Sequence, residues 1–586
     1  LLHVAGGPHT GLIINKLSKY VPGGISSLFF AHSAFHSLYY NSEYRNDVEL
    51  SFSVWLSDGN SRKQEKRSMK FFLRDDVELE LGRSVVHNFF KQLMAGFPKD
   101  YVSFMMRVLK LMQHEFAEIQ RIDMEFKLVS EEEQVVIPDA AQYDSGSEVE
   151  EVTVGHVQEV LEHAFPNGIT IPVMADALRC TEEEVFKFLK ELETLGVARS
   201  VENEWLRVDT RNVDAVARPP HGECFLLRDY LWSRPSDQPT VAIISCLFIE
   251  KQAVDALIDD RSTVHKYKSG GDSNVYTMGR IGQHRVVATK LALIGDTREA
   301  TTSAGSITTR LLGNFQNIEH VFVVGVGGAV PHFTDAKRHA RLGSFIHIYS
   351  HKWKFRKKFF ALSVEEYFSG DVIVSASQPD AYIFSHDLIV DRKTEAFSGF
   401  AVRRWNPVDH VIEQIVANGG DELLSKWNEA TSLGVHRLHE ASTDIDFSMP
   451  PPDTDVLALP VGGGNVVVVP HPNQATRKGA EVHLGTVGAL ANFKRHTEDS
   501  EEDSVGVLRA KFAEEFGVRA IDAGFDSVIA AISGSRIDSW AMIRGIADYQ
   551  HGMSRASKLW QVRDLVSRFL SDVVHLIKKT LEFGLL

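Results

Sequence analysis

The chain has 586 residues, which is too long for one hydrophobic core and indicates about three or four domains. Its 44% hydrophobic and 24% charged residues are typical of a globular protein, and its net charge of −15 disfavours binding of a polyanion by the molecule as a whole. The three cysteines exclude a disulfide framework and a cysteine-based zinc cluster, and the absence of a long apolar run or a signal-peptide pattern predicts an intracellular protein, cytoplasmic or nuclear, with no membrane contact.

Residues 1–127 predict a small α+β domain whose role the sequence does not indicate. Hydrophobic alternation on both sides of Asp58 and Gly59 predicts a β-hairpin. Helical periodicity follows in "SVVHNFFKQLMAGF" and "SFMMRVLKLMQHEFAEI". His32 and His36 are spaced to share a helix face, but no third ligand accompanies them, so we expect no metal site. The acidic stretch 128–151 is typical of a linker.

Residues 152–209 contain three short helical patterns followed by a pair of short strands. The third pattern, "TEEEVFKFLKELETLGV", has Thr181 as its expected N-cap and Gly196 at its end. The strand pair turns at Glu202 and Asn203. This arrangement resembles a winged-helix domain of the Storkhead-box type.

The third helix of this domain occupies the position that reads DNA in winged-helix proteins. Its charged residues are Glu182, Glu183, Glu184, Lys187, Lys190, Glu191 and Glu193. A net negative helix repels phosphates, so we expect a protein partner here and no DNA binding.

A second linker, 210–239, precedes a succession of α/β elements. An apolar strand at 241–244 leads into a helix that begins near Glu250, and a hairpin with its turn at Gly282 and Gln283 follows. After another helix comes "VFVVGVGGAVP", residues 321–331, which predicts a buried strand followed by a glycine loop. Such a loop either lines a ligand pocket or makes a tight strand-to-helix turn.

Several blocks in this region resemble the nucleoside phosphorylase and nucleosidase superfamily, and most closely its fungal receptor-type versions. The blocks are "VAIISCLFIEKQAVDAL", "GDSNVYTMGRIGQHRVV", "VFVVGVGGAVP", "EVHLGTVGAL", "FGVRAIDAGFDSVIAAI" and "WAMIRGIADY". They span residues 240–586 in the family's order. The resemblance implies a three-layer α/β domain with a mixed central sheet that forms homo-oligomers and binds a purine nucleoside or nucleotide. The stretch 351–480 is then a long insertion in this domain.

The same resemblance assigns roles to particular residues. Asp548 falls on the acid that protonates the purine, and Glu250 falls on the carboxylate that activates water. Gly325, Gly327 and Gly328 would lie beneath the base and ribose, and neither a cofactor nor a metal is implied. From the residues alone, Glu250 could instead be a solvated first-turn glutamate, and Asp548 a cap at the end of a strand.

The ribose-binding part of the pattern departs from the family. The family has a Met-Glu pair that grips both ribose hydroxyls, and here Ala523 and Gly524 stand in that place. A shifted register gives Ser527 and Val528, so neither register restores the glutamate. Asp522 or Asp526 could reach the ligand from a neighbouring position.

The family's "RLGD" before its next strand also has a changed counterpart, "RLGS", which ends at Ser344. We therefore predict a partly degenerate purine nucleoside pocket, in a weak or inactive enzyme that acts as a scaffold or ligand sensor. The alternative is an active hydrolase or phosphorylase that cleaves the N-glycosidic bond of a purine nucleoside or nucleotide.

Overall fold

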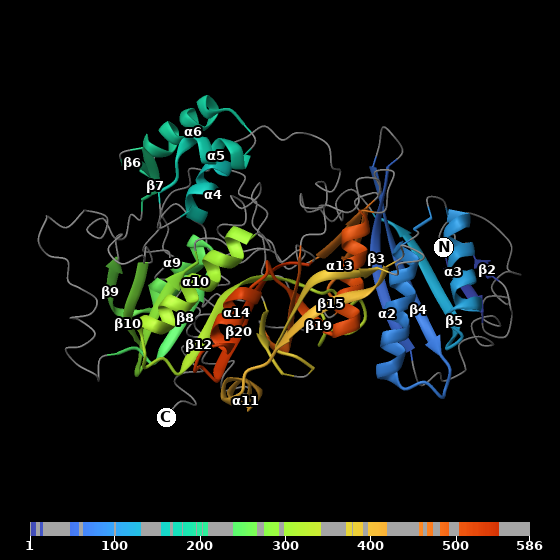
Figure 1. Ribbon diagram of the computed structural model, residues 1–586. Coiled ribbons are helices and arrows are strands. Elements are labelled where there is room, and N and C mark those ends of the chain that lie inside the picture. The colour runs from blue at the N-terminus through green and yellow to red at the C-terminus, as the bar shows by residue number, and fades with distance from the viewer. Residues whose placement is uncertain are drawn as a thin grey trace, which may run out of the picture. The chain divides into compact units, whose positions relative to one another are not determined.

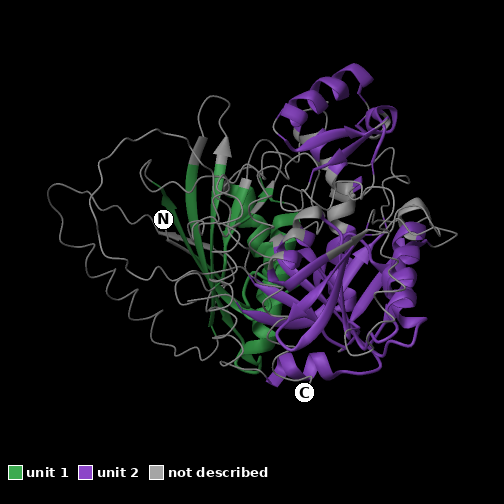
Figure 2. Cartoon of the chain, turned by 90° about the vertical axis from the view of Figure 1, so that its left-hand side faces the viewer, with its two compact units in different colours: residues 1–147, 331–339, 452–477 green, residues 148–330, 340–451, 478–586 purple. Residues whose placement is uncertain are grey.

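The chain folds into two compact units, each assembled from separate stretches of sequence (Figures 1 and 2). Unit 1 comprises residues 1–147, 331–339 and 452–477, and unit 2 comprises residues 148–330, 340–451 and 478–586. The computed structural model describes residues 2–6, 12–15, 47–57, 62–95, 97–98, 101–129, 154–164, 168–178, 180–194, 196–201, 203–208, 238–265, 275–291, 298–340, 371–377, 379–390, 397–418, 456–460, 466–472, 481–491 and 503–549.

Unit 1 contains a seven-stranded sheet in the order β16-β17-β3-β4-β5-β1-β2, in which neighbouring strands are antiparallel. Its elements are β1 (Leu2–Gly6), β2 (Leu12–Asn15), β3 (Asp47–Ser57), β4 (Arg62–Leu73), α2 (Leu79–Ala95), α3 (Tyr101–His114), β5 (Ile119–Leu128), β16 (Val456–Pro460) and β17 (Val466–Pro470). The predicted hairpin is confirmed by the pairing of β3 with β4, while its turn residues lie outside the described part of the chain.

The core of unit 1 forms because the hydrophobic periods of sheet and helix match. Alternate residues of β3 are buried, and α2 buries residues three or four apart. Phe90 packs edge-on against Phe52 with ring centroids 5.1 Å apart, and Phe89 packs in the same way against Phe71 at 5.4 Å. This aromatic layer joins α2 to the sheet.

Strands β16 and β17 come from the stretch that the sequence placed as an insertion in the C-terminal domain. They pair with each other, and β17 pairs with β3, with Val467 opposite Val54. The apolar run of β17 is buried in this sheet. Part of the stretch 351–480 therefore completes the N-terminal sheet, a pairing that hydrophobicity alone does not reveal.

The winged-helix prediction is confirmed element by element. Three helices and a two-stranded wing share one hydrophobic core, with the elements α4 (Val154–Ala164), α5 (Ile171–Leu178), α6 (Glu182–Thr194), β6 (Ala198–Val201) and β7 (Glu204–Arg207). The Thr181 hydroxyl accepts from the Glu184 backbone N–H at 3.3 Å, and the Thr181 N–H donates to the Glu184 carboxylate at 3.0 Å, which makes a capping box. Gly196 ends the helix at a φ of 70°.

The larger part of unit 2 is an 11-stranded sheet flanked by helices. Its strands are β8 (Val241–Ser245), β9 (Asp259–His265), β10 (Val275–Ile281), β11 (His284–Lys290), β12 (His320–Ala329), β13 (Val372–Ser375), β14 (Tyr382–Val390), β15 (Phe397–Trp405), β18 (Val482–Leu490), β19 (Val518–Ile521) and β20 (Ser539–Asp548). The helices are α9 (Phe248–Leu257), α10 (Arg298–Asn314), α11 (Val411–Asn418), α13 (Asp503–Phe516) and α14 (Asp526–Ser533).

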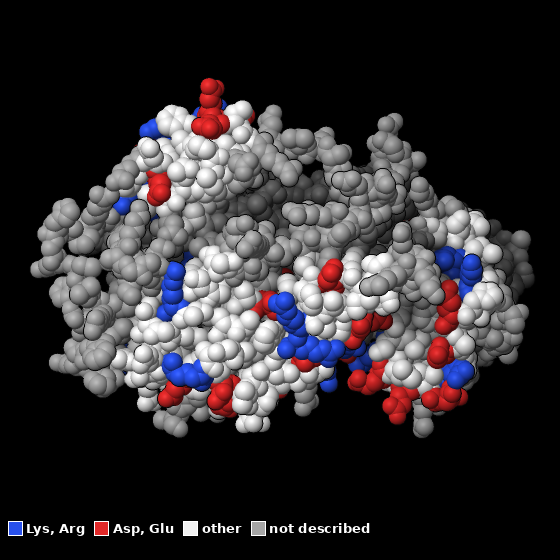
Figure 3. All heavy atoms as spheres, in the orientation of Figure 1, with Lys and Arg blue, Asp and Glu red and all other residues white. Residues whose placement is uncertain are grey.

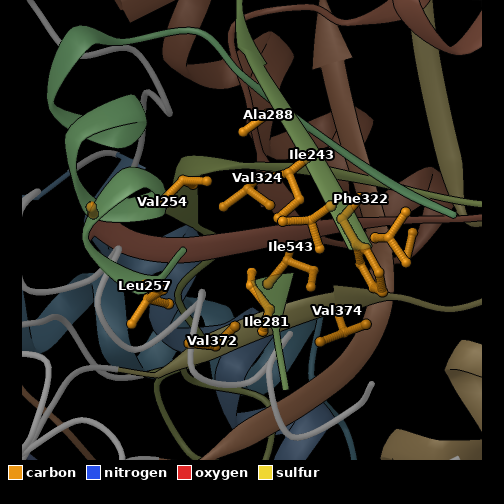
Figure 4. Close-up of a cluster of buried hydrophobic side chains, with 14 of the residues drawn as sticks. Ile243, Val254, Leu257, Ile281, Ala288, Phe322, Val324, Val372, Val374 and Ile543 are labelled. Atoms are coloured by element: carbon orange, nitrogen blue, oxygen red, sulfur yellow. The ribbon is translucent and has the colours of Figure 1, made fainter. Parts of the chain in front are cut away.

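The central strands follow the order β13-β20-β12-β8-β11, so β8 and β12 are adjacent. Strand β12 is parallel to both β8 and β20, whereas β13 is antiparallel to β20. The predicted mixed sheet is therefore confirmed. Strand β19 pairs with both β12 and β18, which closes β12, β20, β13, β18 and β19 into a ring. Figure 4 shows side chains of β8, β12, β13, β20 and α9 meeting in one hydrophobic cluster.

Candidate functional site

The glycine-rich stretch is part of a strand and not the loop that the sequence predicted. Strand β12 continues through Gly325, Gly327 and Gly328, because β20 pairs with it on one side and β19 reaches its end. The glycines make room for side chains from neighbouring elements. A Cβ at Gly325 would lie 2.7 Å from Glu250 Oε1, and one at Gly327 would lie 3.3 Å from Arg544 Cβ. The glycines therefore allow two charged side chains to approach the backbone of β12.

Glu250 lies in the first turn of α9 with its carboxylate turned inward. Its Oε2 accepts from the backbone N–H groups of Cys246 and Leu247, both at 2.8 Å, and its Oε1 accepts from the Val326 N–H at 3.0 Å. The residue is 2% exposed, so the solvated first-turn alternative is wrong. Burial raises the pKa of Glu250, and the three amide bonds and the charge of Arg544 oppose that rise.

Asp522, which follows β19, is held on every side by the protein. Its Oδ2 accepts from Arg544 Nε at 3.2 Å and from Nη2 at 3.0 Å. Its Oδ1 accepts from the Tyr382 hydroxyl at 3.2 Å and from the Gly524 N–H at 3.0 Å. A carboxylate has about four acceptor positions, and four donors already lie on this one. Burial raises the pKa of Asp522, against the opposing effect of Arg544.

Arg544, in the middle of β20, is a residue that the sequence reasoning missed. The side chains of Arg544 and Asp522 have no exposed surface. Arg544 Nη1 donates to the carbonyl oxygens of Val323 at 3.0 Å and Ile543 at 3.2 Å. Its guanidinium carbon lies 4.5 Å from the centre of the Phe525 ring. An arginine inside the apolar run "WAMIRGIA" is the signal that could have identified it.

Ala523 and Gly524, where one register of the resemblance places the Met-Glu pair, lie in a tight turn. Gly524 has a φ of 100°, in the region that residues with a Cβ rarely adopt. The Tyr382 hydroxyl accepts from the Phe525 N–H at 2.7 Å and donates to Asp522, so it fixes both ends of the turn. Helix α14 begins only at Asp526. The backbone at Gly524 therefore favours glycine over any residue with a side chain.

Asp548 is the last residue of β20, and its backbone lies opposite Gly328. The pairing of β12 with β20 shifts register between Gly327 and Gly328, directly beside it. The side chain of Asp548 lies outside the described part of the structure. The fold thus brings Glu250, the glycines of β12 and Asp522 together around Arg544, and places the backbone of Asp548 at the end of the same pair of strands.

A second buried polar pair lies at the start of β13. Strand β13 begins at Val372, directly after Asp371, and Ser344 lies outside the described residues. Asp371 Oδ2 lies 2.8 Å from His483 Nε2, and its Oδ1 accepts from the Glu481 N–H at 2.9 Å. Asp371 is therefore a buried carboxylate held by the elements around β13.

One further side chain near Glu250 bears on its chemistry. Burial raises the pKa of the Cys246 thiol to about 12, so this cysteine is a protonated thiol at neutral pH and not a nucleophile.

Within the part of the chain that is described, no group of three or more His, Cys, Asp or Glu side chains is arranged to hold a metal ion. Also within that part, no helix is both long enough and apolar enough to cross a membrane.

The outward face of α6 in the winged-helix domain is acidic (Figure 3). Glu182, Glu183 and Glu191 are exposed. The ammonium of Lys190 lies 2.7 Å from a Glu193 carboxylate oxygen and 5.4 Å from the centre of the Trp205 ring, so its charge is compensated within the domain. Lys187 is also exposed, but the exposed side chains of α6 carry more negative than positive charge.

Comparison with solved structures finds nucleosidases, all at low identity. A 5'-methylthioadenosine/S-adenosylhomocysteine nucleosidase from Colwellia psychrerythraea in complex with adenine is 12% identical with a TM-score of 0.30, covering 59% of this chain and 96% of that one. The corresponding nucleosidase from Neisseria meningitidis with methylthio-immucillin-A is also 12% identical with a TM-score of 0.30, covering 58% and 99%. Futalosine hydrolase of Helicobacter pylori is 11% identical with a TM-score of 0.29, covering 60% and 99%.

These proteins are of the kind that the sequence blocks resemble, but at such TM-scores the likeness supports no conclusion about activity or ligand. The curated proteins include no match to this chain. A family model described as a winged helix-turn-helix domain matches residues 143–209, beginning somewhat before the expected boundary at 152. The chain therefore contains a winged helix-turn-helix domain at residues 143–209.

Proposed function

We propose that residues 240–586 form a nucleoside phosphorylase-like domain with a degenerate purine nucleoside pocket. In this proposal the domain acts as a scaffold or ligand sensor and has weak or no N-glycosidase activity. The observation that carries the proposal is that the acceptor positions of Asp522 are occupied by Arg544, Tyr382 and Gly524. A carboxylate with no open acceptor cannot grip ribose hydroxyls.

Two further observations support the loss of the ribose grip. The φ of Gly524 disfavours any side chain at the position of the family's glutamate. The carboxylate of Glu250 accepts three backbone N–H bonds, which leaves about one acceptor position for a water molecule. Glu250 then serves mainly to tie the start of α9 to β12.

The alternative is an active hydrolase or phosphorylase, and the burial of Glu250 is the observation that favours it. A fully enclosed carboxyl with a raised pKa, beside a glycine-rich strand, is typical of catalytic acids and bases. In that case Glu250 would activate the water and Asp548 would protonate the departing purine.

Base release by the full chain distinguishes the two functions. The protein is incubated with adenosine, guanosine, inosine, methylthioadenosine or ATP, with and without phosphate, and the free base is measured by chromatography. We expect release at least about 100-fold slower than by a family member with an intact Met-Glu pair, the scale of one lost transition-state contact. Rapid release by the unaltered protein would establish the enzyme.

A matched pair of variants shows whether any residual release belongs to this site. Asp548→Asn should abolish it, whereas Asp538→Asn, an exposed carboxylate just before β20, should leave it unchanged. Equal residual release by both variants would exclude Asp548 as the acid.

The same proposal includes two kinds of protein contact. The acidic face of α6 would meet a protein partner in place of DNA, and the family resemblance implies a homo-oligomer. Sedimentation of the full chain measures the second; monomers at high concentration would exclude it.

A further inference from the structure

Four histidines meet in unit 1 where three separate parts of the chain come together. His87 lies on α2, His332 and His339 lie on the segment 331–339, and His471 follows β17. The His87 and His332 rings stack with centroids 4.1 Å apart and planes inclined by 10°. The rings of His339 and His471 meet edge to face at 4.9 Å. The cluster therefore connects the three separate stretches of sequence that make up unit 1.

Two of these rings act as hydrogen-bond acceptors. The Phe333 N–H donates to His87 Nδ1 at 3.2 Å, and the Asp335 N–H donates to His332 Nδ1 at 3.1 Å. A backbone N–H can only donate, so each accepting nitrogen must carry no proton. This arrangement of the segment therefore requires neutral rings at His87 and His332.

The other two rings act as donors, and neither of these hydrogen bonds depends on an unprotonated nitrogen. His339 Nδ1 lies 2.8 Å from the His332 carbonyl oxygen, and His471 Nε2 lies 2.9 Å from the His339 carbonyl oxygen. A carbonyl oxygen only accepts, so both nitrogens carry a proton in either charge state. The His332 N–H is also 3.2 Å from His339 Nδ1, but the shorter contact with the carbonyl decides which nitrogen is protonated.

Charged residues lie on both of the elements that carry the stacked pair. Besides the histidines, the charged residues of the segment and of α2 within one turn of His87 are Arg83, Lys91, Asp335, Lys337 and Arg338. Four are cations and one is a carboxylate, and two charged rings 4.1 Å apart would repel each other.

We propose that His87 and His332 form a pH-sensitive latch that holds residues 331–339 on α2 near neutral pH and releases them in mild acid. The latched state binds fewer protons than the released state. The equilibrium constant for the latched state is therefore at its maximum above the ordinary histidine range near pH 6.5. Below that range it falls about tenfold per pH unit for each linked histidine. The segment follows β12 with one residue between them, so release would loosen the chain that leads out of the glycine-rich strand.

Hydrogen exchange of the full chain, read by mass spectrometry and corrected for the intrinsic effect of pH, tests the latch. Between pH 7.5 and 5.5 we expect peptides covering 331–339 to lose protection by at least about tenfold in the unaltered protein. In His332→Asn, the amide oxygen takes the place of Nδ1 as an acceptor that does not titrate. Protection in that variant should fall with pH less than in the unaltered protein, because only His87 still titrates. It should be nearly the same at both pH values in the double variant His87→Asn, His332→Asn.

The matched control is His471→Gln, whose amide N–H₂ replaces the Nε2 donor. It removes a buried histidine that the latch does not use, so the loss of protection at pH 5.5 should persist. If His332→Asn does not fold, as judged by circular dichroism, His87→Asn provides the same test at the other acceptor. An unaltered protein with equal protection at both pH values, or an Asn variant that loses protection as the unaltered protein does, would overturn the proposal.

Discussion

Arg544 and Asp522 form an ion pair with no exposed surface on either side chain, in which Nε and Nη2 both donate to Oδ2 at 3.2 and 3.0 Å. The protein therefore supplies its own cation to this buried carboxylate. The consequences for stability and binding can be measured.

Breaking this pair should strongly destabilise unit 2. Asp522→Asn leaves a buried guanidinium without its counter-charge, and we expect a loss of about 3 to 5 kcal/mol in the free energy of unfolding. The control is Arg404→Gln, which breaks an ion pair with Asp380 whose arginine is 53% exposed, and which should cost less than about 1 kcal/mol. Urea denaturation of both variants gives the comparison, and equal losses would contradict the structural role of the pair.

Gly325 should not accept a side chain. The added Cβ of Gly325→Ala would lie 2.7 Å from Glu250 Oε1, so we expect a loss of about 1 to 3 kcal/mol from overpacking. Gly313→Ala, in α10, is the matched substitution, since a Cβ there meets nothing within 4 Å. Its effect should be neutral or stabilising by up to about 1 kcal/mol, because alanine favours helix. Thermal unfolding separates the two, and a harmless Gly325→Ala would show that Glu250 does not lie against β12.

The pH dependence of stability should reveal the buried carboxyl of Glu250. Burial raises the pKa of Glu250 in the folded protein above the ordinary 4.5. At a pH between 4.5 and this folded pKa, the folded protein holds a proton that the unfolded chain has lost. Its contribution is therefore fully present below about pH 4.5 and declines as pH rises through the folded pKa.

Glu250→Gln, which has no titrating group, provides the reference for this effect. It should cost about 1 to 3 kcal/mol at acidic pH, since its amide N–H₂ meets backbone donors. The stability advantage of the unaltered protein over this variant should shrink as pH increases. An advantage that grows with pH would mean that the pKa of Glu250 is lowered and not raised.

The winged-helix domain should not bind duplex DNA at physiological salt. Electrostatic attraction supplies most of non-specific affinity, and the exposed face of α6 presents Glu182, Glu183 and Glu191. Replacing these three with lysine should produce binding that weakens steeply with salt, while the capping residue Glu184 is left in place to preserve the helix. Gel shifts of the full chain measure both proteins, and a shift by the unaltered chain would contradict the prediction.

The sequence alone determined the elements whose causes are local. The apolar runs of β8 and β12, the hairpin turning at Gly282 and the wing turning at Asn203 follow from hydrophobic period and turn chemistry. Thr181 and Gly196 delimit α6 as predicted, because caps act on the neighbouring three or four backbone groups. Such features depend on residues close in sequence, so they can be read without the fold.

Only the tertiary structure decided which separated residues meet. Glu250 bonds to Val326 across 76 positions, and Phe333 bonds to His87 across 246. The apolar run of β17 predicts a strand, but which sheet it joins depends on which edge is open, and that edge is β3. The glycines of β12 are likewise explained by the side chains of Glu250 and Arg544, which approach them only in the fold.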